Sequence, residues 1–292
     1  MTEDTATRPV TTHVVGAGED AITYDIHGDL ADATVDRPAL FLFAGPMDAS
    51  GLALLAARMT DRPVVTYDPR GAGRNPVDTA DITPEQHAAD LHRVIAALGV
   101  GAVDAFGTSG GAVHLLALAA AHPDDLRIAV AHEPPLAEHL PDRDAVLAVI
   151  ADMKRTYAEQ GDGAAMAKFI AFVMFEGPVT DGYLDGPAPD PAMFGMSAED
   201  DGSRTNPLMR NMPATIAYRI DIDALRARGE RLVIAVGVES GDALAARGGR
   251  SVATAVGVPV ADFPSHHAGF TDQPGYPGDP AGFAARLQEV LG

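Results

Sequence analysis

Residues 102–121, AVDAFGTSGGAVHLLALAAA, decide the fold of this chain. They begin with a short, mostly apolar run, residues 102–106, which is typical of a strand buried on both faces of a sheet. The glycine-rich turn GTSGG follows at residues 107–111, and small and apolar residues then predict a helix over 110–121. When a strand turns this sharply into a helix, the central residue of the turn, here Ser109, lies at the carboxyl edge of the sheet.

Similar units lie on both sides of this one. Seven further stretches are predicted as strands: residues 10–15, 21–27, 39–44, 63–67, 126–131, 232–236 and 259–263. Helices are predicted over residues 52–59, 84–98, 243–256 and 281–291, the second of them with Pro84 at its first position. Strands and helices that alternate at this spacing predict a parallel sheet covered by helices on both faces.

The alternation stops at Pro134 and Pro135 and resumes near residue 231. The intervening chain has helical segments at 144–159 and 164–175 and a passage rich in Pro, Gly and Asp at 177–211. An insertion of this size after one strand predicts a cap over the strand ends. We therefore expect an α/β core formed by residues 1–135 and 221–292, and a helical cap subdomain formed by residues 136–220.

Composition excludes several classes of function. The 292 residues carry 41 acidic and 21 basic side chains, a formal net charge of −20, so the chain lacks the basic surface that nucleic acids need. The chain has no cysteine, which excludes disulfides, thiolate metal sites and a cysteine nucleophile. No uninterrupted apolar run is long enough to span a membrane, and residues 1–9 do not form a secretory signal. We expect a cytoplasmic protein.

The turn at residues 107–111 fits the pattern G-x-S-x-G in the context that gives this pattern its meaning. There the Ser109 hydroxyl projects above the sheet, and the Gly110 amide points into the same space as an oxyanion donor, beside the positive end of the helix dipole. A dinucleotide site is the rival interpretation, with Glu133 as the ribose ligand. However, the turn does not spell G-x-G-x-x-G, so no cofactor is expected.

A nucleophilic serine needs a base, and the histidines at 266 and 267 follow the last predicted strand. That is where the base of such a serine lies in the chain. Two adjacent histidines cannot both point into one site. We favour His267, because Ala268 and Gly269 give its backbone room to turn inward, and we place His266 outside.

The acid that orients the base is less clearly marked. Its usual position follows the predicted strand at 232–236, but Ser240 stands there and carries no charge. Glu239 and Asp242 flank that position. Glu133 follows another apolar strand directly before two prolines, where a casual surface charge is not expected. We rank Glu133 first and keep Asp242 and Glu239 as alternatives.

These features together resemble the α/β-hydrolase superfamily, and they are similar to a group of actinobacterial hydrolases. The matching stretches are AGPM at 44–47, YDPRGAGR at 67–74, GTSGG at 107–111, HEPP at 132–135 and FPSHHAGF at 263–270. The resemblance implies a mostly parallel eight-stranded sheet with helices on both faces and an inserted helical cap. It also implies a triad of Ser109, His267 and an acid, and no cofactor.

One departure from that family concerns the oxyanion hole. Most relatives have His-Gly after the strand at 39–44, and the amide of the next residue is the second oxyanion donor. Here Ala44 replaces the histidine, and Pro46 has no N–H to donate. The second donor is then expected from Met47 or from a shifted loop.

The expected function is hydrolysis of a small to medium hydrophobic ester, thioester or lactone through an acyl-enzyme. Seven of the ten methionines lie between 153 and 212, with four phenylalanines, and they form either an adaptable apolar pocket or the core of the cap. Two rivals stay open: a cofactor-free lyase, isomerase or cyclase, and a non-catalytic ligand-binding protein. The expected partner is a small molecule, with no nucleic acid, membrane or metal, and a homodimer stays open.

Overall fold

The computed structural model describes residues 8–76, 80–273 and 275–292. Residues 1–7 of the N-terminal stretch interpreted above therefore lie outside the described residues. In the described part of the chain, no helix is long and apolar enough to cross a membrane.

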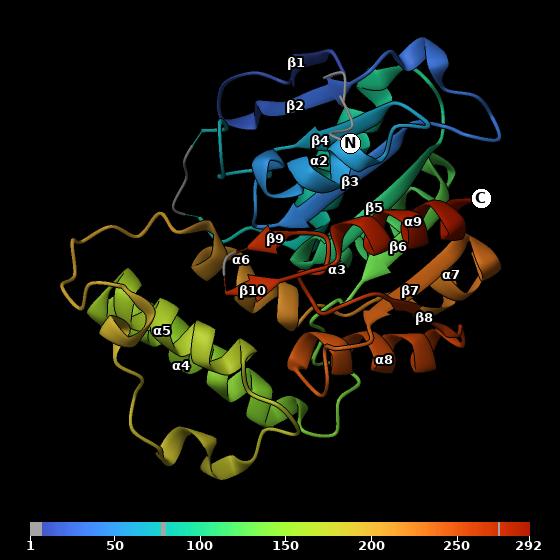
Figure 1. Ribbon diagram of the computed structural model, residues 1–292. Helices are drawn as coiled ribbons and strands as arrows, with labels where there is room; N and C mark the ends of the chain where they lie inside the picture. Colours follow the sequence, from blue (N-terminus) through green and yellow to red (C-terminus); the bar gives the residue numbers. More distant parts are fainter. Residues whose placement is uncertain (1–7, 77–79, 274) are drawn as a thin grey trace.

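The described strands form one eight-stranded sheet in the order β1-β2-β4-β3-β5-β6-β7-β8 (Figure 1). β1 and β2 pair antiparallel, as do β2 and β4, and all pairs from β4 to β8 are parallel. The strands are β1 (Val10–Val15), β2 (Ile22–His27), β3 (Leu40–Gly45), β4 (Val64–Tyr67), β5 (Val103–Ser109), β6 (Leu126–His132), β7 (Leu232–Gly237) and β8 (Val260–Phe263). A separate hairpin consists of β9 (Asp272–Gln273) and β10 (Tyr276–Pro277).

Helices cover both faces of the sheet, as the sequence predicts. The helices are α1 (Ala53–Arg58), α2 (Pro84–Leu98), α3 (Gly110–Ala121), α4 (Arg143–Gln160), α5 (Asp162–Val173), α6 (Pro207–Ile216), α7 (Ile222–Arg226), α8 (Leu244–Val256) and α9 (Pro280–Leu291). Side chains alternate along β3: Phe41 and Phe43 join a core with α2, α3, α7 and α8, whereas Leu40 and Leu42 join a core with α1 and α9. The strand is buried on both faces because each face carries its own helical layer.

A third hydrophobic cluster lies in the segment between β6 and β7. It joins α4, α5 and α6 with Leu244 of α8. Figure 1 shows α4 and α5, in yellow-green, lying to one side of the sheet. The segment thus has a core of its own, although the boundary of a cap at residues 136–220 stays a prediction.

The sequence prediction missed two helices and shortened one strand. α6 and α7 begin in or near a passage rich in Pro and Gly, and α6 contains Pro213 inside the helix, so their local signal is weak. β5 runs to Ser109 rather than to residue 106, because its pairing with β3 continues to the pair Gly45 and Ser109. Tertiary pairing, and not local propensity, extends the strand.

Candidate active site

Ser109 occupies a strained turn between β5 and α3. Its φ of 56° and ψ of −127° lie in a region of backbone conformation that residues other than glycine rarely adopt. The neighbouring glycines allow the turn because there is no space for a side chain: a Cβ at Gly111 would lie 2.7 Å from Ala44 Cα, and one at Gly110 would lie 2.7 Å from the Gly45 carbonyl oxygen. The sequence GTSGG thus sets the start of α3 directly against the end of β3.

The amide of Gly110 is one candidate oxyanion donor. Gly110 is the first residue of α3, so its N–H has no partner within the helix and lies at the positive end of the helix dipole. Gly45 and Pro46 line the same cavity as Ser109 and Gly110. Met47 does not line it, since its side chain lies over Gly51. The prediction that Met47 supplies the second donor stays a prediction.

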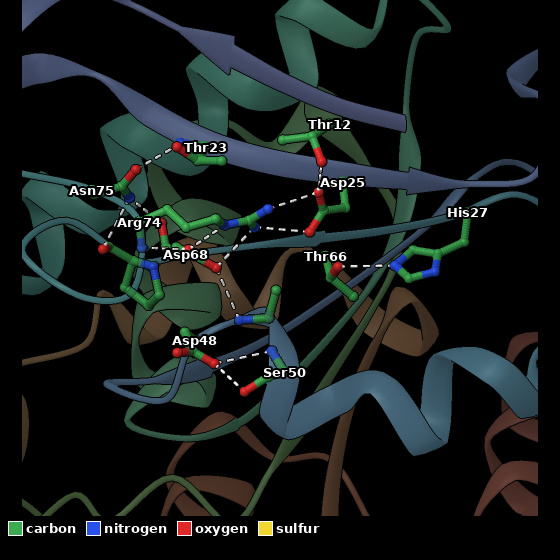
Figure 2. Close-up of polar contacts among 12 residues, drawn as sticks. Thr12, Thr23, Asp25, His27, Asp48, Ser50, Thr66, Asp68, Arg74 and Asn75 are labelled. Carbon is green, nitrogen blue, oxygen red and sulfur yellow. Dashed lines mark hydrogen bonds and ion pairs between the residues drawn. The ribbon is translucent and has the colours of Figure 1, made fainter. Parts of the chain in front are cut away.

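The loop after β3 is held in place by the motif at residues 67–74 (Figure 2). The Asp68 carboxylate accepts the Ala49 amide at 3.1 Å, which fixes the turn that follows Pro46. Figure 2 shows Arg74 between Asp68 and Asp25 of β2; it bonds Asp68 at 2.7 Å and Asp25 at 2.8 Å. The motif therefore positions the loop beside Ser109 and does not itself enter the cavity.

Glu133 and His267 meet at the carboxyl edge of the sheet. Glu133 follows β6 with a φ of 49° and is fully buried. One carboxylate oxygen accepts the Gly237 amide at 2.8 Å, and the other lies 2.5 Å from His267 Nδ1. Burial by itself raises the pKa of Glu133, but the hydrogen bond from His267 and the nearby imidazoles outweigh it and hold the pKa at about 2. The carboxylate is therefore charged at neutral pH and fixes Nδ1–H as the imidazole donor.

The structure separates Glu133 from the other acids considered. Asp242 is exposed and lies 3.4 Å from Arg250. Glu239 is exposed and accepts the Ser265 hydroxyl at 3.3 Å. The structure thus brings Glu133, and neither alternative, to His267.

His266 takes a different environment from His267. Its ring stacks on Tyr276 at 3.7 Å, and its Nε2 lies 3.1 Å from the Pro277 carbonyl oxygen. His266 is thereby tied to β10 and the hairpin. It is nevertheless buried and contributes to the cavity wall, so it does not lie outside the site as expected.

A cavity of about 810 Å³ joins these groups. Ser109, Gly110, Glu133 and His267 all line it. Within the described chain Ser109 and His267 make no hydrogen bond to each other; such contacts often tighten only when substrate binds. Much of the remaining wall is apolar and comes from the segment between β6 and β7 and from α8: Phe169, Phe172, Leu208, Met212, Ile216 and Leu244.

The methionine-rich segment serves both roles considered from the sequence. Met153 and Met209 lie in the hydrophobic cluster of α4, α5 and α6, Met174 lines the cavity, and Met212 belongs to both. Met193 is exposed and belongs to neither.

Two polar residues in the cavity wall were missed by the sequence analysis. His114 lies one helical turn after Gly110, and Asn211 lies on α6. Both are almost fully buried, and their side-chain nitrogen and oxygen atoms have no hydrogen-bond partner within the part of the chain that the structure describes. The helical periodicity of residues 208, 211, 212, 215 and 216 places Asn211 on one face of α6 together with the lining residues. This periodicity could have identified Asn211 only if α6 had been predicted from the sequence.

A metal site was not expected from the histidine spacing. The fold nevertheless gathers His92, His122 and Asp125, whose ligand atoms all lie within 4.8 Å of one another. The two rings stack in parallel at 3.9 Å, and His92 Nδ1 lies 2.6 Å from Asp125. Parallel rings direct their lone pairs side by side rather than toward one point, so the arrangement is a stacked pair with an acid. The absence of a metal stays a prediction.

Comparison with known proteins agrees with this architecture. A family model described as the α/β-hydrolase fold matches residues 48–187, a range that includes Ser109 and Glu133 and ends before His267. A comparison with curated proteins gave no match.

Solved structures resemble the chain over nearly its whole length. A hydrolase from Pseudomonas aeruginosa PA01 is 19% identical with a TM-score of 0.65, covering 97% of this chain and 98% of its own. The enol-lactonase from Burkholderia xenovorans LB400 is 18% identical with a TM-score of 0.66, covering 96% and 99%. A thermophilic esterase from Thermogutta terrifontis is 17% identical with a TM-score of 0.65, covering 97% and 100%. At these identities the likeness concerns the fold, and the fold predicted from the sequence is confirmed.

Proposed function

Because the chain is an α/β-hydrolase-fold protein, we propose that it is a serine hydrolase that cleaves a small to medium hydrophobic ester, thioester or lactone. The observation that carries this proposal is the 2.5 Å contact between Glu133 and His267 Nδ1, at the wall of the cavity that also exposes Ser109. A charged, buried acid bound to an imidazole beside a serine on a strained turn supports nucleophilic catalysis.

In the acylation step, His267 Nε2 takes the proton of the Ser109 hydroxyl as its oxygen attacks the substrate carbonyl carbon. The carbonyl oxygen gains the negative charge and is stabilised by the Gly110 N–H and the dipole of α3. Glu133 stabilises the imidazolium. The C–O or C–S bond to the leaving group then breaks, and His267 returns its proton to that group.

In the deacylation step, His267 removes a proton from water, whose oxygen attacks the acyl carbon. The tetrahedral intermediate collapses, Ser109 recovers its proton from His267, and the acid product leaves. The net reaction adds one water across the ester, thioester or lactone bond. The apolar wall supports a hydrophobic acyl or alcohol group. The names esterase and enol-lactonase, which belong to two of the similar structures, are consistent with this chemistry.

Labelling by a fluorophosphonate probe tests the nucleophile. We expect the wild type to be labelled and the Ser109→Ala variant to remain unlabelled. Ser240→Ala is the matched control, because Ser240 is a second serine in the wall of the same cavity, and it should keep the label. Labelling that persists in Ser109→Ala would contradict the proposal.

One observation favours a second candidate, a cofactor-free lyase, isomerase or cyclase that uses His267 as a base. Pro46 has no N–H and Met47 does not line the cavity, so the second oxyanion donor is not evident. A missing donor costs about 10²–10³ in rate when charge develops on oxygen. A panel of p-nitrophenyl esters that shows no burst and no turnover, with Ser109 still reactive toward the probe, would favour this second candidate.

A further inference from the structure

The face of α6 that lines the cavity contains a polar anomaly. Leu208, Met212 and Ile216 supply apolar side chains, as expected for a helix packed over an apolar space. Asn211 and Thr215 interrupt this face at a spacing of one helical turn. Asn211 is 3% exposed, and neither its amide oxygen nor its amide nitrogen has a hydrogen-bond partner among the described residues.

An unpaired carboxamide is unusual at this degree of burial, because most buried polar groups in folded proteins are paired. Leucine has a similar volume and would fill the position without the desolvation penalty, so packing alone does not explain asparagine here. A second lining residue repeats the anomaly: His114 of α3 has both ring nitrogens unpaired among the described residues, and burial lowers its pKa well below the ordinary value. Both groups are thus uncharged, and α3 packs against α6.

The charge of the wall limits what these groups can bind. Among the described residues that line the cavity, Glu133, Glu176 and Glu239 are acidic and none is lysine or arginine. Neither Glu176 nor Glu239 takes part in a salt bridge in the described chain. An anionic substituent would therefore meet carboxylates and no compensating cation.

We propose that Asn211 is a specificity-determining residue that binds an uncharged polar group of the substrate, one that both donates and accepts hydrogen bonds, as a carboxamide does. The preferred substrate is then an apolar ester, thioester or lactone that carries one such group in addition to the scissile carbonyl group. This inference rests on the proposed function for its scissile bond, but it concerns a residue that takes no part in the acyl transfer.

The test compares esters that have the same chain length and differ in their terminal group. The probes are p-nitrophenyl alkanoates of short, medium and long chain, each with analogues in which the terminal methyl group is replaced by a carboxamide or by a carboxylate. At one chain length the wild type should prefer the carboxamide over the methyl ester by roughly tenfold, mainly through KM. It should disfavour the carboxylate. Asn211→Leu should abolish the preference for the carboxamide over the methyl ester.

Asn211→Leu should also raise the melting temperature of the free protein, by roughly 2–4 °C, since it removes an unpaired buried amide. If Asn211 only supported the structure, the same substitution would lower the melting temperature. Met209→Leu is the control: Met209 is buried on the same helix, does not line the cavity, and should change neither the preference nor the basal activity. A wild type without the preference, an Asn211→Leu variant that keeps it, or a lowered melting temperature in that variant would overturn the inference.

The Ser109→Ala variant separates this inference from the proposed function. Binding of the same uncleaved esters to that variant, followed by the shift in melting temperature, reports the carboxamide preference without turnover. If the wild type hydrolyses no ester, the proposed hydrolase function fails. The inference about Asn211 is then judged on binding alone, with the same expected and contrary results.

Discussion

At the scale of single residues, Glu133 combines full burial with a charge. It keeps that charge because His267 Nδ1 and the Gly237 amide both donate to its carboxylate. Neutral glutamine has nearly the same shape, but it cannot stabilise an imidazolium and it permits the wrong imidazole tautomer.

We expect Glu133→Gln to lower kcat for a p-nitrophenyl ester by roughly 10³–10⁴ with little change in KM, because the acid acts mainly in the transition state. Asp242→Asn is the matched control and should stay within about twofold, since that carboxylate is exposed and pairs with Arg250. Steady-state kinetics of both variants measures this. Equal losses of kcat in the two variants would contradict the proposed role of Glu133.

At the scale of elements, the site depends on the contact between the end of β3 and the start of α3. Gly111 permits this contact, because a Cβ there would lie 2.7 Å from Ala44 Cα and 2.9 Å from the Phe43 carbonyl oxygen, both backbone atoms. Neither neighbour can move as a flexible side chain would, so β3 and α3 would have to separate.

Gly111→Ala should therefore reduce the free energy of unfolding by about 1–3 kcal/mol, as overpacking does. Activity should fall as well, because the shift displaces Gly45 and Gly110 around Ser109. Gly182→Ala is the control: its nearest neighbour is a flexible Asp185 side chain at 3.7 Å, and the change should stay within about 0.5 kcal/mol. Urea denaturation of both variants gives the comparison, and equal midpoints would show that β3 and α3 are not in close contact.

At the scale of the whole molecule, buried neutral histidines set the response to acid. Burial lowers the pKa of His87 to about 3 and that of His132 to about 4, and it places that of His114 well below 6.5. Below pH 6.5 the unfolded chain binds protons that these folded residues do not. Stability is therefore fully present above pH 6.5 and falls as the pH decreases toward the folded values.

We expect the free energy of unfolding to drop by up to about 4 kcal/mol for each pH unit below 6.5, which corresponds to three histidines. The lowered pKa of Glu133 adds a loss between its ordinary value of 4.5 and about 2. Denaturation midpoints between pH 7 and pH 5 test the histidine contribution. His87→Leu should flatten the slope by about a third; an unchanged slope in that variant would show that His87 is protonated in the folded protein.

A feature of the fold could be predicted from the sequence when a few neighbouring residues encode it. The apolar runs, the turn GTSGG and the Thr83–Pro84 helix start each depend on a few neighbouring residues, so α2, α3 and the strands other than β5 were predicted nearly to the residue. The positions of Ser109 and of the two candidate histidines follow from chain order on such a sheet.

Only the tertiary structure decided which acid meets His267, which polar groups face the cavity and where α6 lies. Glu133 and His267 are 134 residues apart, and they meet because β6, β7 and β8 are adjacent in the sheet and end at the same edge. The environment of Asn211 likewise arises from α6 packing over a cavity formed by distant segments. Local sequence fixes what a segment can form, whereas burial and pairing between remote segments exist only once the chain has folded.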